Sequence, residues 1–516
     1  MAAIITDQLR ILNAANFRAG IASTANNYYV WVGLPNATDV ESTWNITPPA
    51  PKDSFNDEDE YWNTIIALKK VPETDVRRVV PKYVWASGTK YDMYRDDYTR
   101  SNIAPVSSST NLYDAKYFIV NKDYRVYECL YNGISPDNPT GKPSLDEPLF
   151  TDLEPRAAGT SGDGYIWKYL YTLTPSEIIK FESTDYVPVP EDWATNTTDA
   201  PVRDNAATSG QLKIVTITNR GTGYGTATVY SDVNILGDGT GGKASVTVNS
   251  DGKIEAVDVS TGGSGYTFGT LDLDGAGITN SASSTDAQTS IVIPPQGGHG
   301  ADIYRELGSF KVMIYSRLEN DTTNPDFITG NHFARVGVVK DPQVYNSSSL
   351  LTSSKASGLN ALKVSAANLA NITFDADAVI TQTVGLGSTA VGRVVSWDST
   401  TGVLKYWQDR QVATSSTVGT PPEFGYKLLS FENTLFSGDG SFDISGGSAT
   451  VAIDTSFTGV STVLNSKTYF LGQTFEKGTA NPEVKRHSGD IVYVDNRPSV
   501  LRSSNQKEDV KIILEF

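Results

Sequence analysis

The C-terminal residues constrain the fold most strongly. From Val510 to Phe516 the chain reads Val-Lys-Ile-Ile-Leu-Glu-Phe, an extended and largely apolar stretch. A terminal segment of this kind buries its Ile, Leu and Phe side chains by pairing into a sheet. The sequence therefore predicts a C-terminal β-strand that is fixed in a core, and a chain whose fold depends on strand pairing.

Length and composition bound the organisation of the chain. Its 516 residues exceed what one core can hold, which predicts roughly three or four domains. A hydrophobic content of 39% is ample for globular folding, and no window approaches the ~18 uninterrupted apolar residues of a membrane span. The N-terminus lacks a basic region followed by a long apolar run, so no secretory signal is expected. We therefore expect cytosolic synthesis and no membrane insertion.

Charge and cysteine content exclude further classes. A net charge of −17 argues against nucleic acid as a main ligand, because phosphate binding needs a basic surface. Cys129 is the one cysteine, so an intrachain disulfide is impossible. Its strand-like surroundings predict a buried free thiol. A reactive thiol would need a base and an electropositive setting, and the sequence supplies neither.

Hydrophobic periodicity predicts a mainly β fold with a few short helices. Helices are expected at 4–21, capped by Thr6 or Asp7 and closed by Gly20, and at 57–70. Alternation and β-branched or aromatic content predict the strands. The clearest strands are 28–33, 79–85, 116–121, 124–131, 165–173, 303–317 and 336–339.

A glycine-rich region from 206 to 294 contains an internal repeat. Residues 215–224, which end in Gly-Thr-Gly-Tyr, recur at 257–266, which end in Gly-Ser-Gly-Tyr, with an offset of 42 residues. Residues 244–259 form a predicted hairpin around Asp251-Gly252. Two such units indicate a small all-β module, too short for a solenoid.

A second region of low charge, 346–478, also predicts an all-β module. Its expected strands are 378–384, 391–397, 403–408 and 450–454. The simplest architecture is one aromatic-rich β-sandwich core interrupted by two inserted modules. This division is 1–205 for the first part of the core, 206–294 for the first module, 295–345 for the second part of the core, 346–478 for the second module and 479–516 for the C-terminal core strands.

No catalytic, cofactor or metal site emerges from the motifs. The glycine clusters at 221–225 and 297–300 lack the features of a phosphate loop and predict turns. The three histidines, at 299, 332 and 487, have no metal-ligand spacing. The turn at 272–275 lacks the full ligand spacing of a calcium loop. No carboxylate pair stands out in an apolar setting that would raise a pKa. The sequence therefore predicts a protein that is not an enzyme.

Four stretches resemble the dimeric wedge protein in the baseplates of T-even-like contractile-tailed phages, and they occur in that family's order. The stretches are 49–85, 126–130, 162–170 leading to 186–190, and 486–498 with the closing strand. The third and fourth are the specific ones. Their motif residues are Gly162, Asp163, Gly164, Tyr165, Trp167, Arg486, Ser488, Gly489, Tyr493, Asn496 and Arg497.

The resemblance implies a structural role in a virus particle. It implies a β-sandwich flanked by short helices, a homodimer, and contacts with other baseplate wedge proteins around the tail hub. It also implies a place in the virion tail baseplate and a part in relaying rearrangement toward sheath contraction. The family has no catalytic residues to transfer. The resemblance does not extend to 206–294 or 346–478, which could contact tail fibre proteins, neighbouring wedges or the host envelope.

Two other functions stay open at this point. One is a carbohydrate-binding tail adhesin that uses the inserted modules, in which Tyr224, Tyr266, Trp397 and Trp407 would line a groove. The other is a polysaccharide hydrolase, for which no acid and base pair is visible. The interface residues of a structural subunit cannot be named without a sheet order.

Overall fold

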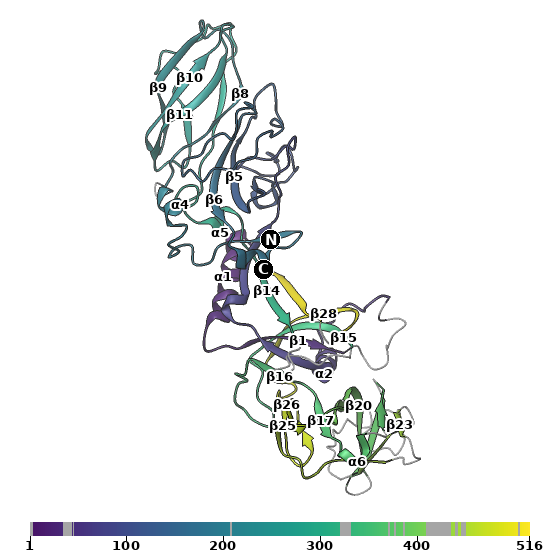
Figure 1. Cartoon of the computed structure of the whole chain (residues 1–516). Coiled ribbons are helices and arrows are strands. Elements are labelled where there is room, and N and C mark those ends of the chain that lie inside the picture. The colour runs from purple at the N-terminus through teal and green to yellow at the C-terminus, as the bar shows by residue number, and fades with distance from the viewer. Residues whose placement is uncertain are drawn as a thin grey trace. The chain divides into compact units, whose positions relative to one another are not determined.

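The fold is mainly β, as the sequence predicts, with antiparallel sheets and a few short helices (Figure 1). The computed structural model describes residues 4–34, 44, 46–206, 209–319, 332–369, 372–375, 378–384, 388–408, 435–438, 442–444, 450–503 and 506–516. In this part of the chain no helix is both long enough and apolar enough to cross a membrane.

The chain divides into two compact units. Unit 1 comprises Met1–Arg18, Val76–Met313 and Ile512–Phe516, and unit 2 comprises Ala19–Asp75 and Ile314–Lys511. Both units are therefore built from segments that are distant in sequence. The five-part division drawn from the sequence has different boundaries, and it stays a prediction.

Helix α1 (Asp7–Ala22) opens the described chain. Thr6 caps it, because the Thr6 hydroxyl accepts a 3.3 Å hydrogen bond from the amide of Leu9. The helix continues past Gly20, where the sequence analysis ended it, and stops at Ala22. Gly20 takes a helical conformation there without a positive φ, so nothing obliges the helix to end at that glycine.

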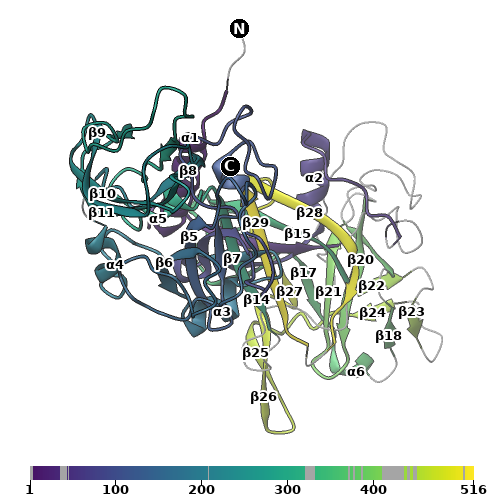
Figure 2. The same ribbon diagram turned by 90° about the horizontal axis from the view of Figure 1, so that it is seen from above.

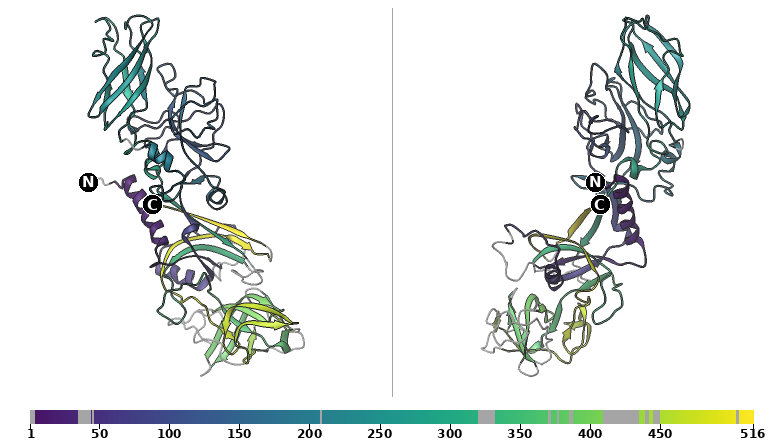
Figure 3. Two further views of the ribbon diagram at one scale, coloured as in Figure 1. Left: turned by 60° about the vertical axis from the view of Figure 1, so that its left-hand side comes forward. Right: turned by 180° about the vertical axis from the view of Figure 1, so that it is seen from behind.

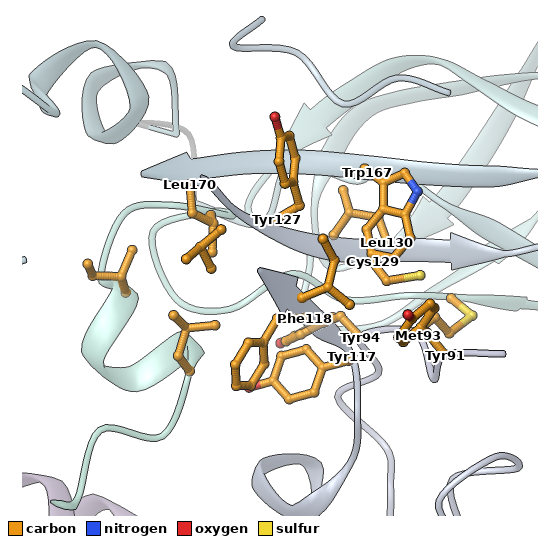
Figure 4. Close-up of a cluster of buried hydrophobic side chains, with 14 of the residues drawn as sticks. Tyr91, Met93, Tyr94, Tyr117, Phe118, Tyr127, Cys129, Leu130, Trp167 and Leu170 are labelled. Atoms are coloured by element: carbon orange, nitrogen blue, oxygen red, sulfur yellow. The ribbon is translucent and has the colours of Figure 1, made fainter. Parts of the chain in front are cut away.

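A three-stranded sheet and its aromatic core form the centre of unit 1. The sheet has the order β4-β5-β6, with β4 at Phe118–Val120, β5 at Arg125–Asn132 and β6 at Tyr165–Thr172. Cys129 pairs with Trp167 across β5 and β6. Figure 4 shows both residues in a cluster of buried side chains that includes Tyr94 and Tyr117. The predicted buried free thiol is confirmed.

A four-stranded sheet contains the C-terminal strand. Its order is β29-β14-β3-β7, with β3 at Val76–Pro81, β7 at Tyr186–Pro188, β14 at Lys311–Leu318 and β29 at Glu508–Glu515. The predicted terminal strand is therefore confirmed, and Ile512 is buried in it. The predicted strand 303–317 is wrong at its start, where helix α5 (Ile303–Glu306) lies. The Asp302 carboxylate caps α5 by accepting hydrogen bonds from the amides of Tyr304 and Arg305.

The glycine-rich region of unit 1 has a sheet and a core of its own (Figure 3). Four strands have the order β11-β10-β9-β12, and β13 pairs with β8. The strands are β8 at Val215–Asn219, β9 at Thr228–Gly237, β10 at Thr240–Val248, β11 at Ile254–Ser264, β12 at Gly269–Leu271 and β13 at Gln288–Ile291. The predicted hairpin around Asp251-Gly252 corresponds to β10 and β11.

The two copies of the repeat have the same backbone conformation. Gly221 and Gly223 have φ of 62° and 82°, and Gly263 and Gly265 have φ of 61° and 78°. Only glycine adopts these values readily, which explains why the two copies share this spacing. The tyrosine that follows each pair turns into the core of the module, and Tyr224 and Tyr266 are both buried.

Unit 2 contains a five-stranded sheet with the order β16-β2-β1-β15-β28. The strands are β1 at Tyr28–Gly33, β2 at Ile65–Lys70, β15 at His332–Lys340, β16 at Lys355–Ser357 and β28 at Asp490–Leu501. The predicted helix 57–70 is wrong in its second half. Helix α2 (Phe55–Thr64) ends at Thr64, because the β-branched pair Ile65-Ile66 pairs with β1 and buries both side chains in the sheet.

Unit 2 also contains a seven-stranded sheet with the order β24-β22-β19-β20-β21-β17-β27 (Figure 2). Its strands are β17 at Asn360–Lys363, β19 at Val379–Val384, β20 at Ser388–Asp398, β21 at Val403–Gln408, β22 at Leu435–Gly438, β24 at Thr450–Ala452 and β27 at Thr479–Ala480. Two-stranded pairs join β18 (Ile372–Phe374) to β23 (Phe442–Ile444) and β25 (Gly459–Leu464) to β26 (Lys467–Phe475).

The remaining helices are short. They are α3 at Pro175–Phe181, α4 at Ala200–Asn205 and α6 at Ala366–Leu369, with 3₁₀ turns at Glu73–Asp75 and Leu112–Asp114. Helix α3 has a complete capping box, in which the Thr174 hydroxyl and the Glu177 carboxylate each accept a hydrogen bond from the other residue's amide.

Candidate functional site

The first specific motif forms the turn before β6. Gly162 and Gly164 have φ of 69° and 86°, values that favour glycine. Between them the buried Asp163 carboxylate accepts hydrogen bonds from the amides of Leu145 at 2.8 Å and Tyr165 at 3.0 Å. The Asp163 side chain therefore fixes both the turn and the segment that precedes it.

Tyr165 and Trp167 extend this motif into the core. Their rings stack with centroids 5.3 Å apart and an interplanar angle of 16°, and both side chains are fully buried. The Tyr165 hydroxyl accepts a 3.0 Å hydrogen bond from the amide of Tyr91 and donates one of 2.8 Å to the carbonyl of Lys142. These residues hold the fold together and present no reactive group to solvent.

The second specific motif begins in the turn that precedes β28. Arg486 is partly buried, and Ser488 is buried with its hydroxyl donating to the Lys485 carbonyl at 2.5 Å. The same hydroxyl accepts a 2.9 Å hydrogen bond from the amide of Gln343. Gly489 has a φ of 76°, and a Cβ at that position would lie 2.3 Å from the Lys340 carbonyl oxygen. Only glycine fits this approach of two backbone segments.

The rest of the second motif lies on β28 itself. Tyr493 pairs with Val338 of β15, and Asn496 pairs with Arg335. The Arg497 side chain is exposed, and its backbone carbonyl accepts a 2.8 Å hydrogen bond from the Trp44 indole. Both motifs therefore consist of turn and pairing residues, and their correspondence to the motifs of the wedge-protein family stays a prediction.

A buried polar cluster in unit 1 is the chemically richest site in the described chain. Its members are Glu128 on β5, Glu306 on α5, and His299 in the loop that precedes α5. The His299 Nδ1 lies 2.9 Å from Glu128 Oε2 and 2.9 Å from Glu306 Oε1. Glu128 is fully buried and Glu306 nearly so, and His299 is 8% exposed.

Several groups of unit 1 hold this cluster in place. The amide of Gly300 donates a 2.6 Å hydrogen bond to Glu306 Oε2, and the Trp193 indole donates one of 3.0 Å to the Gly300 carbonyl. The Tyr94 ring meets the His299 ring edge-on, with centroids 4.8 Å apart. The Tyr117 hydroxyl donates to the backbone carbonyl of Glu306. The loop and α5 are therefore fixed against β5.

Burial and proximity change the proton affinities in the cluster. Burial, followed by the charge of Glu306, raises the pKa of the Glu128 carboxyl to about 8, although His299 partly opposes the shift. Burial alone would lower the pKa of His299, but the two carboxylates overcome this effect and raise it to about 9. Both groups therefore hold a proton more strongly than the free side chains do.

The sequence did not reveal this cluster. The expectation that no carboxylate pair lies in an apolar setting that would raise a pKa is wrong for Glu128 and Glu306, which are both buried beside His299. One signal was available, since Glu128 is the single charged residue between Val126 and Tyr131 of an apolar strand. Its partners lie more than 170 residues away, so no local spacing reveals them.

The other candidates named from the sequence do not form such clusters. His332 is exposed and lies 3.0 Å from the Ser499 hydroxyl, and His487 lies 3.0 Å from Asp59. The Asp272 carboxylate accepts a hydrogen bond from the amide of Gly275 and closes a turn. Among the described residues, Glu128, His299 and Glu306 form the one group of three with metal-ligand character.

The aromatic residues required by a sugar-binding groove are packed inside the modules. Tyr224, Tyr266 and Trp407 are 5%, 2% and 8% exposed. Trp397 is partly buried and packs edge-on against Phe374, with ring centroids 4.9 Å apart. These four residues therefore line no open groove, which removes the observation that the adhesin hypothesis required.

Comparison with known proteins shows that the chain is similar to a protein of a phage tail baseplate. The model of the family described as bacteriophage T4 Gp8 matches residues 3–142. The particular relative is the baseplate wedge protein gp8 of Enterobacteria phage T4, which is 26% identical over 229 residues. The match covers 39% of this chain and 64% of that protein, which is less than two thirds of its length. The resemblance predicted from the sequence is thereby confirmed.

Proposed function

We propose that this protein is a structural subunit of a phage tail baseplate wedge. The observation that carries the proposal is the similarity to the baseplate wedge protein gp8, found both by the family match over residues 3–142 and by the alignment of 229 residues. The subunit sits in the tail baseplate of the virion and is assembled in the host cytoplasm. Its function is mechanical, and it is not an enzyme.

The architecture supports a mechanical role. Each unit is built around buried aromatic side chains, and edge-to-face ring pairs join its strands, such as Tyr127 with Tyr169 in unit 1 and Phe374 with Trp397 in unit 2. The specific sequence motifs are used for turns and strand pairing, not for presenting reactive groups. A rigid body of this kind can keep a defined geometry between its neighbours and pass on a displacement toward sheath contraction.

The partners follow from the same role. We infer a homodimer, together with contacts to other baseplate wedge proteins and to tail fibre proteins. The net charge of −17 is consistent with subunits that repel one another in solution and dock on a complementary surface. Nucleic acid is not a partner in this proposal, because the chain lacks the excess of basic residues that phosphate binding needs.

Co-expression with the other wedge proteins of the same phage tests the proposal. The full chain carries an affinity tag, each candidate partner is untagged, and the purified complex is analysed by light scattering. We expect at least one wedge protein to co-purify in a fixed ratio, and the chain alone to have the mass of a dimer. A chain that is monomeric and retains no wedge protein at low or physiological salt would overturn the proposal. A trimer that binds glycans would favour the tail adhesin instead.

A further inference from the structure

The cluster of Glu128, His299 and Glu306 has no part in the proposed mechanical role, yet it brings together three ligand side chains from different parts of unit 1. Strand β5 supplies Glu128, the glycine-flanked loop supplies His299, and α5 supplies Glu306. We propose that these three side chains bind a divalent transition-metal ion, best matched by zinc, which ties the loop and α5 to the central sheet of unit 1. The inference does not depend on the proposed function.

The ligand types and their spacing suit such an ion. Imidazole nitrogen and carboxylate oxygen bind zinc at about 2.0–2.2 Å, so two ligand atoms on one tetrahedral ion lie about 3.3–3.6 Å apart. Nδ1 of His299 lies 2.9 Å from an oxygen of each glutamate, and the three ligand atoms all lie within 4.8 Å of one another. A small adjustment of the carboxylates would place all three around one ion.

The charge of the cluster also suits a divalent cation. Two carboxylates and one imidazole are buried together, and the ion pairs described for Glu128 and Glu306 are those with His299. Lys168 lies directly across from Glu128 in the sheet, but its ammonium group donates to the Leu153 carbonyl and to Asn205 Oδ1. A divalent ion bound to a neutral imidazole would neutralise both carboxylates, which is a strong requirement in a buried setting.

An unused ligand atom provides a second, independent observation. Glu128 Oε1 is buried and has no hydrogen-bond partner. A buried acceptor left in this state costs about 1–3 kcal/mol of stability, so native structures rarely leave one without a partner. Coordination of Glu128 through both oxygens, or through one oxygen and a metal-bound water, would satisfy it.

The surrounding contacts are those of a supported metal site. Side chains that bind a metal ion are commonly oriented by hydrogen bonds to neighbouring groups. Here the Gly300 amide orients the Glu306 carboxylate, the Trp193 indole holds Gly300, and the Tyr94 ring restricts the rotation of His299. The ligands come from segments that are far apart in sequence, so an ion would stabilise the folded unit and not a local loop.

Metal analysis of the full chain tests the inference without any substitution. The protein is expressed in medium supplemented with zinc, purified without chelator and measured by elemental mass spectrometry. We expect one zinc ion per chain, a Tm that falls by several degrees after dialysis against a strong chelator, and recovery of the Tm when zinc is returned. Cobalt(II) added to the metal-free protein should give the visible absorption of a bound, non-aqueous ion.

Matched variants then locate the ion. His299→Gln and Glu306→Gln should each abolish the binding of zinc and cobalt(II), whereas His332→Gln, at an exposed histidine, should retain one ion per chain. If the buried variants fail to fold, the chelator and cobalt(II) results on the unaltered chain still decide. The inference would be overturned if the protein bound neither ion and its Tm did not change with the chelator. The cluster would then be a hydrogen-bonded ion pair between His299 and the two glutamates. Full retention of the ion by a folded His299→Gln variant would also overturn it.

Discussion

Asn496 lies opposite Arg335 on neighbouring strands of unit 2, and its amide oxygen accepts a 3.0 Å hydrogen bond from Arg335 Nε. Arg335 is almost fully buried, it donates a second hydrogen bond to the Thr64 hydroxyl at 2.8 Å, and its guanidinium group lies 5.1 Å from the ring centroids of both Trp44 and Tyr61. A residue of the C-terminal motif thus satisfies a buried charge on β15. The Asn496 side chain therefore has a packing role in unit 2.

Replacement of Asn496 by alanine should destabilise unit 2. The substitution removes an acceptor from a buried guanidinium group, which costs about 1–3 kcal/mol. Arg497→Ala is the matched control, because the Arg497 side chain is 64% exposed and its ion pair with Asp495 is worth at most about 1 kcal/mol. Hydrogen exchange of the β15 and β28 amides gives both values. Equal effects of the two substitutions would contradict the assignment.

Two of the motif glycines, Gly162 and Gly489, should differ in their tolerance of a side chain. Both have a positive φ, which costs an alanine about 1–2 kcal/mol. A Cβ on Gly162 would meet nothing within 4 Å, whereas one on Gly489 would collide with the Lys340 carbonyl oxygen. Gly162→Ala should therefore fold with a modest loss of stability, and Gly489→Ala should lose at least about 3 kcal/mol or fail to fold. Circular dichroism during thermal unfolding compares the two, and similar Tm values would refute the distinction.

Local sequence patterns predicted those elements of the fold that depend on neighbouring residues. Alternation and the content of β-branched and aromatic residues located β5 and β6, and the apolar C-terminal stretch located β29, because these signals lie in consecutive residues. The end of α2 was misplaced, because Ile65 continues the helical pattern in sequence but pairs with β1 in space. The tertiary partner overrode the local preference.

The candidate site could not be predicted, because it is formed by contacts between residues that are distant in sequence. Glu128, His299 and Glu306 are ordinary residues in their own segments, and their ligand character appears only when β5, the glycine loop and α5 come together. The same limit applies to Arg335, whose partners Thr64 and Asn496 come from α2 and β28. One sequence gives the residue types, and the long-range topology decides which of them meet.

Cys129 should be inert in the folded protein. Its thiol is fully buried, and burial raises its pKa well above the ordinary value, so both access and thiolate formation are suppressed. We expect no reaction with a water-soluble thiol reagent until the protein is denatured, and then one thiol per chain. Ser250→Cys provides the positive control, because Ser250 is exposed in the hairpin between β10 and β11 and should react at once. Rapid labelling of the unaltered chain would contradict the burial of Cys129.

Asp238, in the turn between β9 and β10, should titrate at unusually low pH. The Thr267 hydroxyl and the amides of Thr267 and Phe268 donate to its carboxylate, and these bonds lower its pKa to about 2. Because the folded pKa is depressed, its contribution to stability is present above the ordinary pKa of 3.8 and is lost as the pH falls through about 2. NMR titration of the carboxyl carbon measures this pKa directly. Thr267→Val should move it back toward 3.8, and an unchanged value would disprove the role of the hydroxyl.

The two tyrosines of the repeat occupy equivalent positions but should not be equally important. The Tyr266 hydroxyl accepts a 3.0 Å hydrogen bond from the amide of Gly242 and donates one of 2.8 Å to the carbonyl of Ile235, and both bonds are buried. The Tyr224 hydroxyl accepts one partly buried bond of 2.7 Å from the amide of Ala287. Tyr266→Phe leaves two buried backbone groups without a partner, which costs about 2–4 kcal/mol, and Tyr224→Phe leaves one, which costs about 1 kcal/mol.

Hydrogen exchange of the β9 and β10 amides measures the difference, because Ile235 and Gly242 lie on these strands. The Tyr266 ring also explains the glycines around it: a Cβ on Gly239 would lie 2.4 Å from the ring, and one on Gly242 would lie 2.7 Å from the hydroxyl oxygen. Phenylalanine keeps the ring and removes only the hydroxyl, so the exchange rates report the hydrogen bonds alone. If Tyr224→Phe accelerated exchange as much as Tyr266→Phe, the hydrogen bonds of Tyr266 would not stabilise the module more than the hydrogen bond of Tyr224 does, and the prediction would be wrong.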